Sequence, residues 1–119
     1  MSDARAERAR VINEAWRQVD LGGCRVMDKN WRSGEHQLDL VATDGHGTLI
    51  AVDVRDPAPG GQVPELDDIS DDRADQLRAA AQAWAAQQRH PYDEVRVDVV
   101  GFVPSRAGSL TCEHVEGVA

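Results

Sequence analysis

The sequence predicts an α/β fold in which two helices flank a mixed five-stranded sheet, all within one domain over residues 1–119. Two segments repeat apolar residues at the three- and four-residue spacing of a helix, whereas five others alternate or run apolar as strands do. The chain of 119 residues suits a single hydrophobic core, and no linker divides it.

The first helix is expected from Ala4 to Val19, because apolar residues recur on one helical face from Val11 onward. Gly22 and Gly23 follow, and glycine readily takes the left-handed conformation that ends helices. A strand from Cys24 to about Trp31 comes next.

A hairpin is predicted after that strand, with strands at His36–Thr43 and Thr48–Arg55. The loop AspGlyHisGly between them supplies glycines for positive backbone angles. Residues 56–64, with the sequence DPAPGGQVP, then break regular structure, since proline lacks a ladder donor and glycine weakens a strand.

A second helix should begin with Asp68 or Ser70 as its cap and run to about Arg89. Strands at Glu94–Val103 and Ser109–Val115 complete the set. In the first of these, Arg96 and Asp98 should face opposite to the valines. Because a helix connects the third strand to the fourth, these two strands are expected to run parallel in an otherwise antiparallel sheet.

Composition limits the function classes. The chain has 13 basic and 21 acidic residues, and its formal charge of −8 repels a polyanion at long range. Its two cysteines, Cys24 and Cys112, fit neither a zinc motif nor a disulfide framework, which indicates a reducing compartment. The charged N-terminus lacks the apolar segment of a signal peptide, and no run approaches the ~20 apolar residues of a membrane span. We therefore expect a cytoplasmic protein without a membrane contact.

Charged residues interrupt the apolar pattern of the hairpin. Strand alternation places Gln37 and Asp39 on one face, opposite to Leu38, and the same parity groups Asp53 with Arg55. If the two charged faces coincide, two carboxylates and a guanidinium lie close together. Such carboxylates could bind Mg²⁺ or Mn²⁺ as a phosphodiester-cleaving site. The alternative is a salt bridge on a half-exposed sheet.

Five segments resemble, in order, the YraN family of predicted endonucleases, and together they cover nearly the whole chain. They are GCRVMDKNWR, QLDLVATDG, LIAVDVR, VRVDVVGF and CEHVEGVA. The resemblance implies a restriction-endonuclease-like fold, similar to archaeal Holliday-junction resolvases, and an activity that is largely inferred for the family itself.

The resemblance also implies roles for individual residues. Asp39 matches the first metal-binding aspartate, whereas Asp53 stands where the family has glutamate and Arg55 where it has lysine. Gln37 replaces a glutamate two positions before the first aspartate, a role that Glu35 could take over.

Other family positions fall on the helices and the first strand. The glutamate of the first helix falls on Ile12, which belongs to the apolar stripe, or on Glu14 if the alignment shifts. Arg73 takes the place of a lysine that starts the second helix. Arg32, in the family-like AsnTrpArg, is a candidate for phosphate contact.

The replacements predict a weakened cation site. Asp53 reaches less far than glutamate by one methylene, about 1.5 Å, and octahedral Mg²⁺ tolerates such an error poorly. Arg55 cannot act as a base and could instead clamp Asp39 and Asp53 where a metal would bind. The acidic residues around Arg73 either repel DNA or stabilise the start of the second helix.

Three functions follow from these observations. The first is a nuclease-fold protein that associates with nucleic acid, with an eroded metal site and weak or no cleavage. The second is an active Mg²⁺- or Mn²⁺-dependent endonuclease acting on branched or structured DNA through Asp39, Asp53 and Glu35, with Arg55 stabilising the phosphate. The third is a domain that binds a protein partner. The oligomeric state stays open, although a dimer would suit branched DNA.

Overall fold

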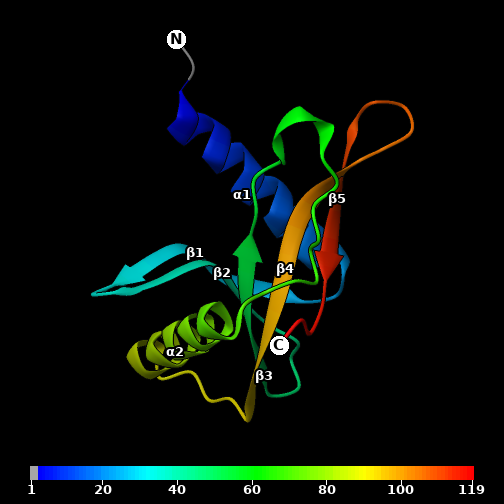
Figure 1. Cartoon of the computed structure of the whole chain (residues 1–119). Coiled ribbons are helices and arrows are strands. Elements are labelled where there is room, and N and C mark those ends of the chain that lie inside the picture. The colour runs from blue at the N-terminus through cyan, green and yellow to red at the C-terminus, as the bar shows by residue number, and fades with distance from the viewer. Residues whose placement is uncertain (1–2) are drawn as a thin grey trace.

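The computed structural model describes residues 3–119, which form one five-stranded sheet with a helix on each face (Figure 1). The elements in chain order are α1 (Ala4–Leu21), β1 (Arg25–Ser33), β2 (His36–Thr43), β3 (Thr48–Val54), α2 (Asp71–Gln88), β4 (Glu94–Pro104) and β5 (Leu110–Val115). The predicted α/β fold, with two helices and five strands, is confirmed. The loop after β3 was expected to lack regular structure, yet it contains a short 3₁₀ turn at Pro59–Gly61.

The strands lie in the sheet in chain order, β1-β2-β3-β4-β5. All neighbours are antiparallel except β3 and β4, which run parallel because α2 crosses between them. The mixed sheet expected from the sequence is therefore confirmed. The outer part of the β1–β2 hairpin extends beyond the other strands (Figure 1).

Both helices begin at polar caps. The Asp3 carboxylate accepts hydrogen bonds from the backbone N–H groups of Arg5 and Ala6 at the start of α1. Ser70, rather than Asp68, caps α2 by accepting from the Arg73 N–H. Between residues 3 and 119, neither helix combines the length and the apolar character needed to cross a lipid bilayer.

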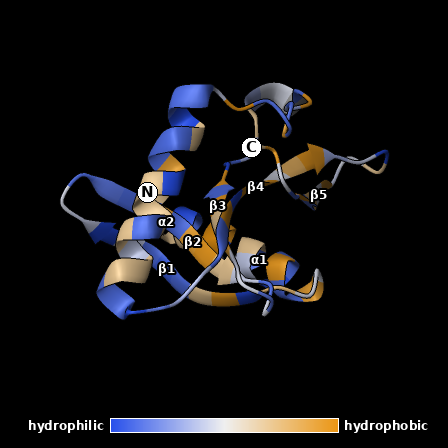
Figure 2. Cartoon of the chain, turned by 90° about the horizontal axis from the view of Figure 1, so that it is seen from below, coloured by the Kyte–Doolittle hydropathy of each residue, from blue (hydrophilic) through white to orange (hydrophobic). Residues whose placement is uncertain are grey.

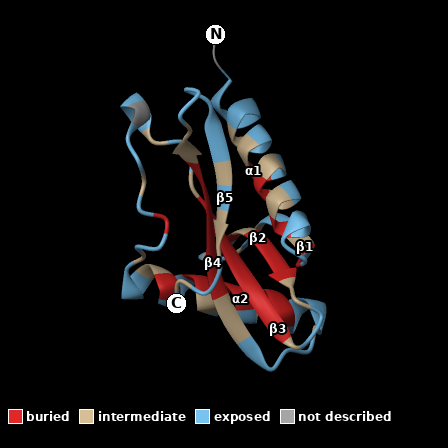
Figure 3. Cartoon of the chain, turned by 90° about the vertical axis from the view of Figure 1, so that its right-hand side faces the viewer, coloured by how far each residue is buried: buried red, intermediate tan, exposed pale blue. Residues whose placement is uncertain are grey.

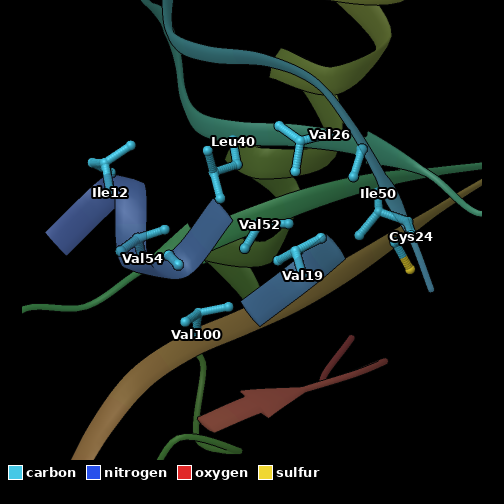
Figure 4. Close-up of a cluster of buried hydrophobic side chains, with 11 residues drawn as sticks. Ile12, Val19, Cys24, Val26, Leu40, Ile50, Val52, Val54 and Val100 are labelled. Atoms are coloured by element: carbon cyan, nitrogen blue, oxygen red, sulfur yellow. The ribbon is translucent and has the colours of Figure 1, made fainter. Parts of the chain in front are cut away.

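The core lies in two layers, one on each side of the sheet, and the buried residues follow the central strands (Figure 3). On one side, Ile12 and Val19 of α1 pack against Leu40, Val52 and Val54 (Figure 4). The α2-side layer contains Leu38, Val41, Leu49, Ala51, Leu77, Trp84 and Val97. Hydrophobic residues accordingly concentrate on the central strands, whereas the outer part of the β1–β2 hairpin is hydrophilic (Figure 2).

Leu38 does not follow the alternation of side chains between the two sheet faces that the sequence predicted for β2. It packs in the α2-side layer, although Leu40, two residues later, packs against α1. The hairpin is distorted at this point, because Asn30 of β1 has φ of 49° and lies opposite Asp39, between the pairs Lys29–Leu40 and Trp31–Leu38. A left-handed residue inside a strand interrupts the regular pleat, so the face of Leu38 cannot be read from parity alone.

Candidate functional site

Asp39 and Asp53 lie next to each other at the point where β2 and β3 part. The pairing of the two strands ends at Leu40 and Val52, and one Asp39 Oδ then accepts from the Val54 N–H at 2.8 Å. The side chains of Asp39 and Asp53 are each 12% exposed. The structure thus brings together the two carboxylates that the sequence singled out.

Asp39 forms an ion pair with Arg8 of α1, a residue that was not predicted from the sequence to belong to the site. The Arg8 guanidinium lies 3.1 Å from the second Asp39 oxygen and 2.8 Å from an Asp56 oxygen. It also donates to the Val54 carbonyl at 2.9 Å. Arg8 precedes the buried Ile12 by one helical turn on the same face, and this spacing was the signal that could have placed it against the sheet.

Asp53 is bound by two other arginines. Its oxygens lie 3.1 Å from the Arg73 guanidinium and 3.4 Å from Arg55 Nε. The remaining nitrogens of Arg55 donate to the backbone carbonyls of Glu65 and Asp68 at 3.1 and 2.9 Å. The expectation that Arg55 clamps both aspartates is therefore corrected, because Arg55 reaches Asp53 and fixes the following loop while Arg8 holds Asp39.

Burial raises the pKa of Asp39 above its ordinary value. The Val54 N–H and the Arg8 guanidinium oppose this rise, whereas the negative charge of Asp53 adds to it. The two carboxylates are thus close enough to affect each other's charge. The Arg8 guanidinium stabilises the ionised form of Asp39, because burying a charged carboxylate without a partner costs free energy.

The donor set does not fit a resident divalent cation. All four oxygens of Asp39 and Asp53 are already bonded to a backbone N–H or paired with a guanidinium. Mg²⁺ requires several oxygen ligands in near-octahedral geometry, and a bound cation would lie beside the positive charges of the arginines. Within the described residues, no three His, Cys, Asp or Glu side chains are grouped so that they could hold a metal ion.

The glutamates considered as substitutes do not join the pair. Glu14 forms an ion pair with Arg17 at 3.5 Å and lies near Cys112, whose pKa burial and Glu14 raise to about 11. Ile12 is 1% exposed and packs in the core, as expected. Glu35 instead lines a hollow beside Arg73.

Two surface hollows flank the start of β2 and share Gln37. The α2-side hollow, of about 460 Å³, is lined by Glu35, His36, Gln37, Arg73, Gln76 and Ala79. The α1-side hollow, of about 490 Å³, is lined by Ala4, Arg5, Arg8, Ala9, Asn30, Arg32 and Gln37. Gln37 is exposed and lies between the two hollows. The candidate phosphate contacts Arg32 and Arg73 lie in different hollows.

A second buried carboxylate, Asp98 of β4, was not recognised as a site. It is 0% exposed and accepts from Arg96 at 2.8 and 2.9 Å, from the Gly117 N–H at 2.9 Å and bonds to His114 Nε2 at 2.7 Å. Burial works to raise the pKa of Asp98, but the hydrogen bonds from His114, Arg96 and Gly117 hold it below its ordinary value. With every oxygen bonded inside the protein, this cluster is structural.

The fold and this site define a small α/β protein with a mixed sheet and a pair of strand-borne aspartates held by arginines. The chain belongs to the uncharacterised protein family UPF0102, which matches residues 13–102. Membership of this YraN-like family, expected from the sequence, is confirmed. Arg5 and Arg8 lie before the matched segment.

Relatives cover most of the chain. A UPF0102 protein of Beutenbergia cavernae is 36% identical over an alignment of 110 residues, and the match covers 87% of this chain and 87% of that protein. One from Streptomyces coelicolor is 33% identical and covers 88% of this chain and 82% of its own. Among solved structures, SfsA of Pyrococcus furiosus, in complex with Ca²⁺, is similar with a TM-score of 0.36 and 15% identity, covering 96% of this chain and 64% of that one.

Proposed function

We propose that the protein associates with nucleic acid through arginine side chains around the Asp39–Asp53 pair and cleaves phosphodiesters weakly or not at all. The observation that carries this proposal is the occupation of both carboxylates by guanidinium groups. A guanidinium stays protonated and cannot act as a base, but its planar fork binds phosphate well. Arg32 and Arg73, on the two sides of Gln37, are the substrate contacts.

The proposal is tested by measuring binding and cleavage on the same DNA. Labelled branched, flapped and plain duplexes are titrated with the protein at low salt, where phosphate contacts are strongest. The same DNA is then incubated with Mg²⁺ or Mn²⁺, with and without a chelator. We expect binding without chelator-sensitive cleavage. Absence of binding to every DNA would contradict the proposal and leave the protein-partner function.

An active Mg²⁺- or Mn²⁺-dependent endonuclease is the second candidate. It is favoured by the proximity of two carboxylates: burial raises the pKa of Asp39, and the negative charge of Asp53 adds to this rise. This candidate would replace the first if the chelator stops DNA cleavage and if Asp39→Ala and Asp53→Ala each abolish it. Calorimetric titration with Mn²⁺ provides a separate readout: saturable binding to the protein that is lost in Asp39→Ala.

A further inference from the structure

We infer that the α1-side hollow binds the phosphate backbone of double-stranded DNA. This inference rests on the proposed function and assigns it to a defined surface, apart from the two aspartates. Three arginines and two amides converge on the hollow from separate elements: Arg5 and Arg8 from α1, and Asn30, Arg32 and Gln37 from the β1–β2 hairpin.

The charge of this hollow is opposite to that of the whole chain. The formal charge is −8, yet its lining, as far as the described residues show, contains no carboxylate. Other hollows carry them: Glu7 and Asp56 in one, Asp93 in another, and Glu65, Asp67 and Glu113 in a third. A cationic hollow on an acidic protein concentrates an anionic ligand locally, because charges of one sign in a concave surface reinforce each other.

Two of the arginines are available to a ligand. Arg8 is held by Asp39 and Asp56, which offset its charge. Arg5 and Arg32 are exposed, and in residues 3–119 neither side chain forms an ion pair. Arg5 also lies in the first turn of α1, where a positive charge opposes the helix dipole, so it does not serve to stabilise the helix.

The arrangement suits a polymer of phosphates better than a single anion. Gln37 lines both hollows, so arginines lie on its two sides, Arg5 and Arg32 on one and Arg73 on the other. Arg73 is paired with Asp53 and shares its hollow with Glu35, so the stronger positive charge lies on the α1 side. The α1-side lining includes no aromatic side chain among the described residues, and it therefore offers guanidinium contacts without a stacking platform for unpaired bases. This combination favours a duplex backbone over a single strand.

The backbone conformation of Asn30 supports the assignment of this hollow as a binding surface. Its φ of 49° lies in the left-handed region inside a β-strand, although the residue is exposed. Asparagine tolerates this conformation better than most residues, and strained backbone is often found at binding sites. Asn30 is thereby held at the rim of the hollow, opposite Asp39 and its partner Arg8.

The test compares arginines on the same protein by fluorescence anisotropy with a labelled duplex. Arg5→Ala and Arg32→Ala are measured against Arg10→Ala, a matched control: Arg10 is an exposed arginine of α1 that lines the hollow containing Glu7 and Asp56. Each of the first two variants should bind about tenfold more weakly, the loss of one charge-assisted contact. Each should also reduce the slope of log affinity against log salt by about one. Arg10→Ala should bind like the wild type.

The outcomes separate this inference from the proposed function. If the wild type binds duplex DNA but Arg5→Ala and Arg32→Ala behave like Arg10→Ala, the hollow is not the site and the proposed function stands. If the wild type binds no DNA, both fail. Tighter binding to the single strand of the same sequence, or equal affinity for polyglutamate of matched charge, would overturn the assignment to duplex backbone. Unchanged thermal melting of Arg5→Ala and Arg32→Ala shows that the variants are folded.

Discussion

At the scale of single residues, Arg8 has the place beside Asp39 that the sequence predicted for a metal ion or for Arg55. It joins α1 to β2 through Asp39, to the end of β3 through Val54 and to the following loop through Asp56. A guanidinium is suited to this role because its several donors reach acceptors in different directions. The aspartate pair thus contributes to the attachment of a helix.

Replacing Arg8 should destabilise the protein, because Asp39 would remain as a largely buried carboxylate without its cation. We expect Arg8→Ala to lower the free energy of unfolding by about 1 to 2 kcal/mol in urea denaturation. Arg10→Ala, an exposed change on the same helix, should stay within about 0.5 kcal/mol. Adding Asp39→Asn to Arg8→Ala should restore part of the loss. Equal effects of the two arginine variants would contradict this role.

The sequence predicted part of this residue network. Asp39 and Asp53 were expected to converge on the condition that the charged faces of the two strands coincide, because strand parity depends only on local spacing. Arg8 could not be paired with Asp39 in advance, since that contact depends on how α1 lies across the sheet. The burial of Asp98 was missed for the same reason: its partners His114 and Gly117 come from the segment after β4.

At the scale of elements, the helices and strands were predictable where one local signal dominated. Gly22 and Gly23 mark the end of α1, Ser70 caps α2, and the valines of β4 form an apolar strand. The distortion in the β1–β2 hairpin was not predictable, because Asn30 gives no warning that it is left-handed. Next to this position, Leu38 packs against α2 and not against α1.

The conformation of Asn30 leads to a prediction about β1. Asn30→Val should lower stability by about 1 to 2 kcal/mol, because a β-branched residue disfavours positive φ. Asn30→Gly should cost less, since glycine adopts this angle without strain. Asn30 is exposed, so neither change removes packing. Urea denaturation of the two variants measures the difference, and equal stability would show that the backbone relaxes at this position.

At the scale of the whole molecule, Asp98 links the sheet to the C-terminal segment. Gly117 donates to Asp98, and beyond it Val118 and Ala119 bond to the backbone of Val97. Arg96 supplies two further bonds from the same strand. Because the hydrogen bonds from His114, Arg96 and Gly117 outweigh the cost of complete burial, the ionised form of Asp98 contributes to the stability of the entire fold.

The pH dependence of unfolding should report this carboxylate. The pKa of Asp98 is lowered in the folded protein from an ordinary value of 3.8, so folding favours the ionised form. This contribution is fully present above pH 3.8 and is lost as the pH falls through the lower folded value. Asp98→Asn should therefore be less stable than the wild type at neutral pH, and the difference should shrink in acid below that value.

The stability difference between the wild type and Asp98→Asn is measured from denaturation curves recorded from neutral pH into the acid range. Asp67→Asn is the matched control, because Asp67 is exposed and forms no ion pair within the described chain. A difference between Asp98→Asn and the wild type that stays constant through the acid range would show that ionisation of Asp98 does not contribute.

The parallel pairing of β3 with β4 has a consequence for how the chain is made. Every residue of β3 is buried, and one of its two edges is covered by β4, which follows only after the long loop and α2. A nascent chain that has not yet reached Glu94 leaves the unpaired N–H and C=O groups of that edge open to pairing with other chains. Correct folding during synthesis therefore requires that β4, which follows α2, pairs with β3 before a strand of a second molecule does.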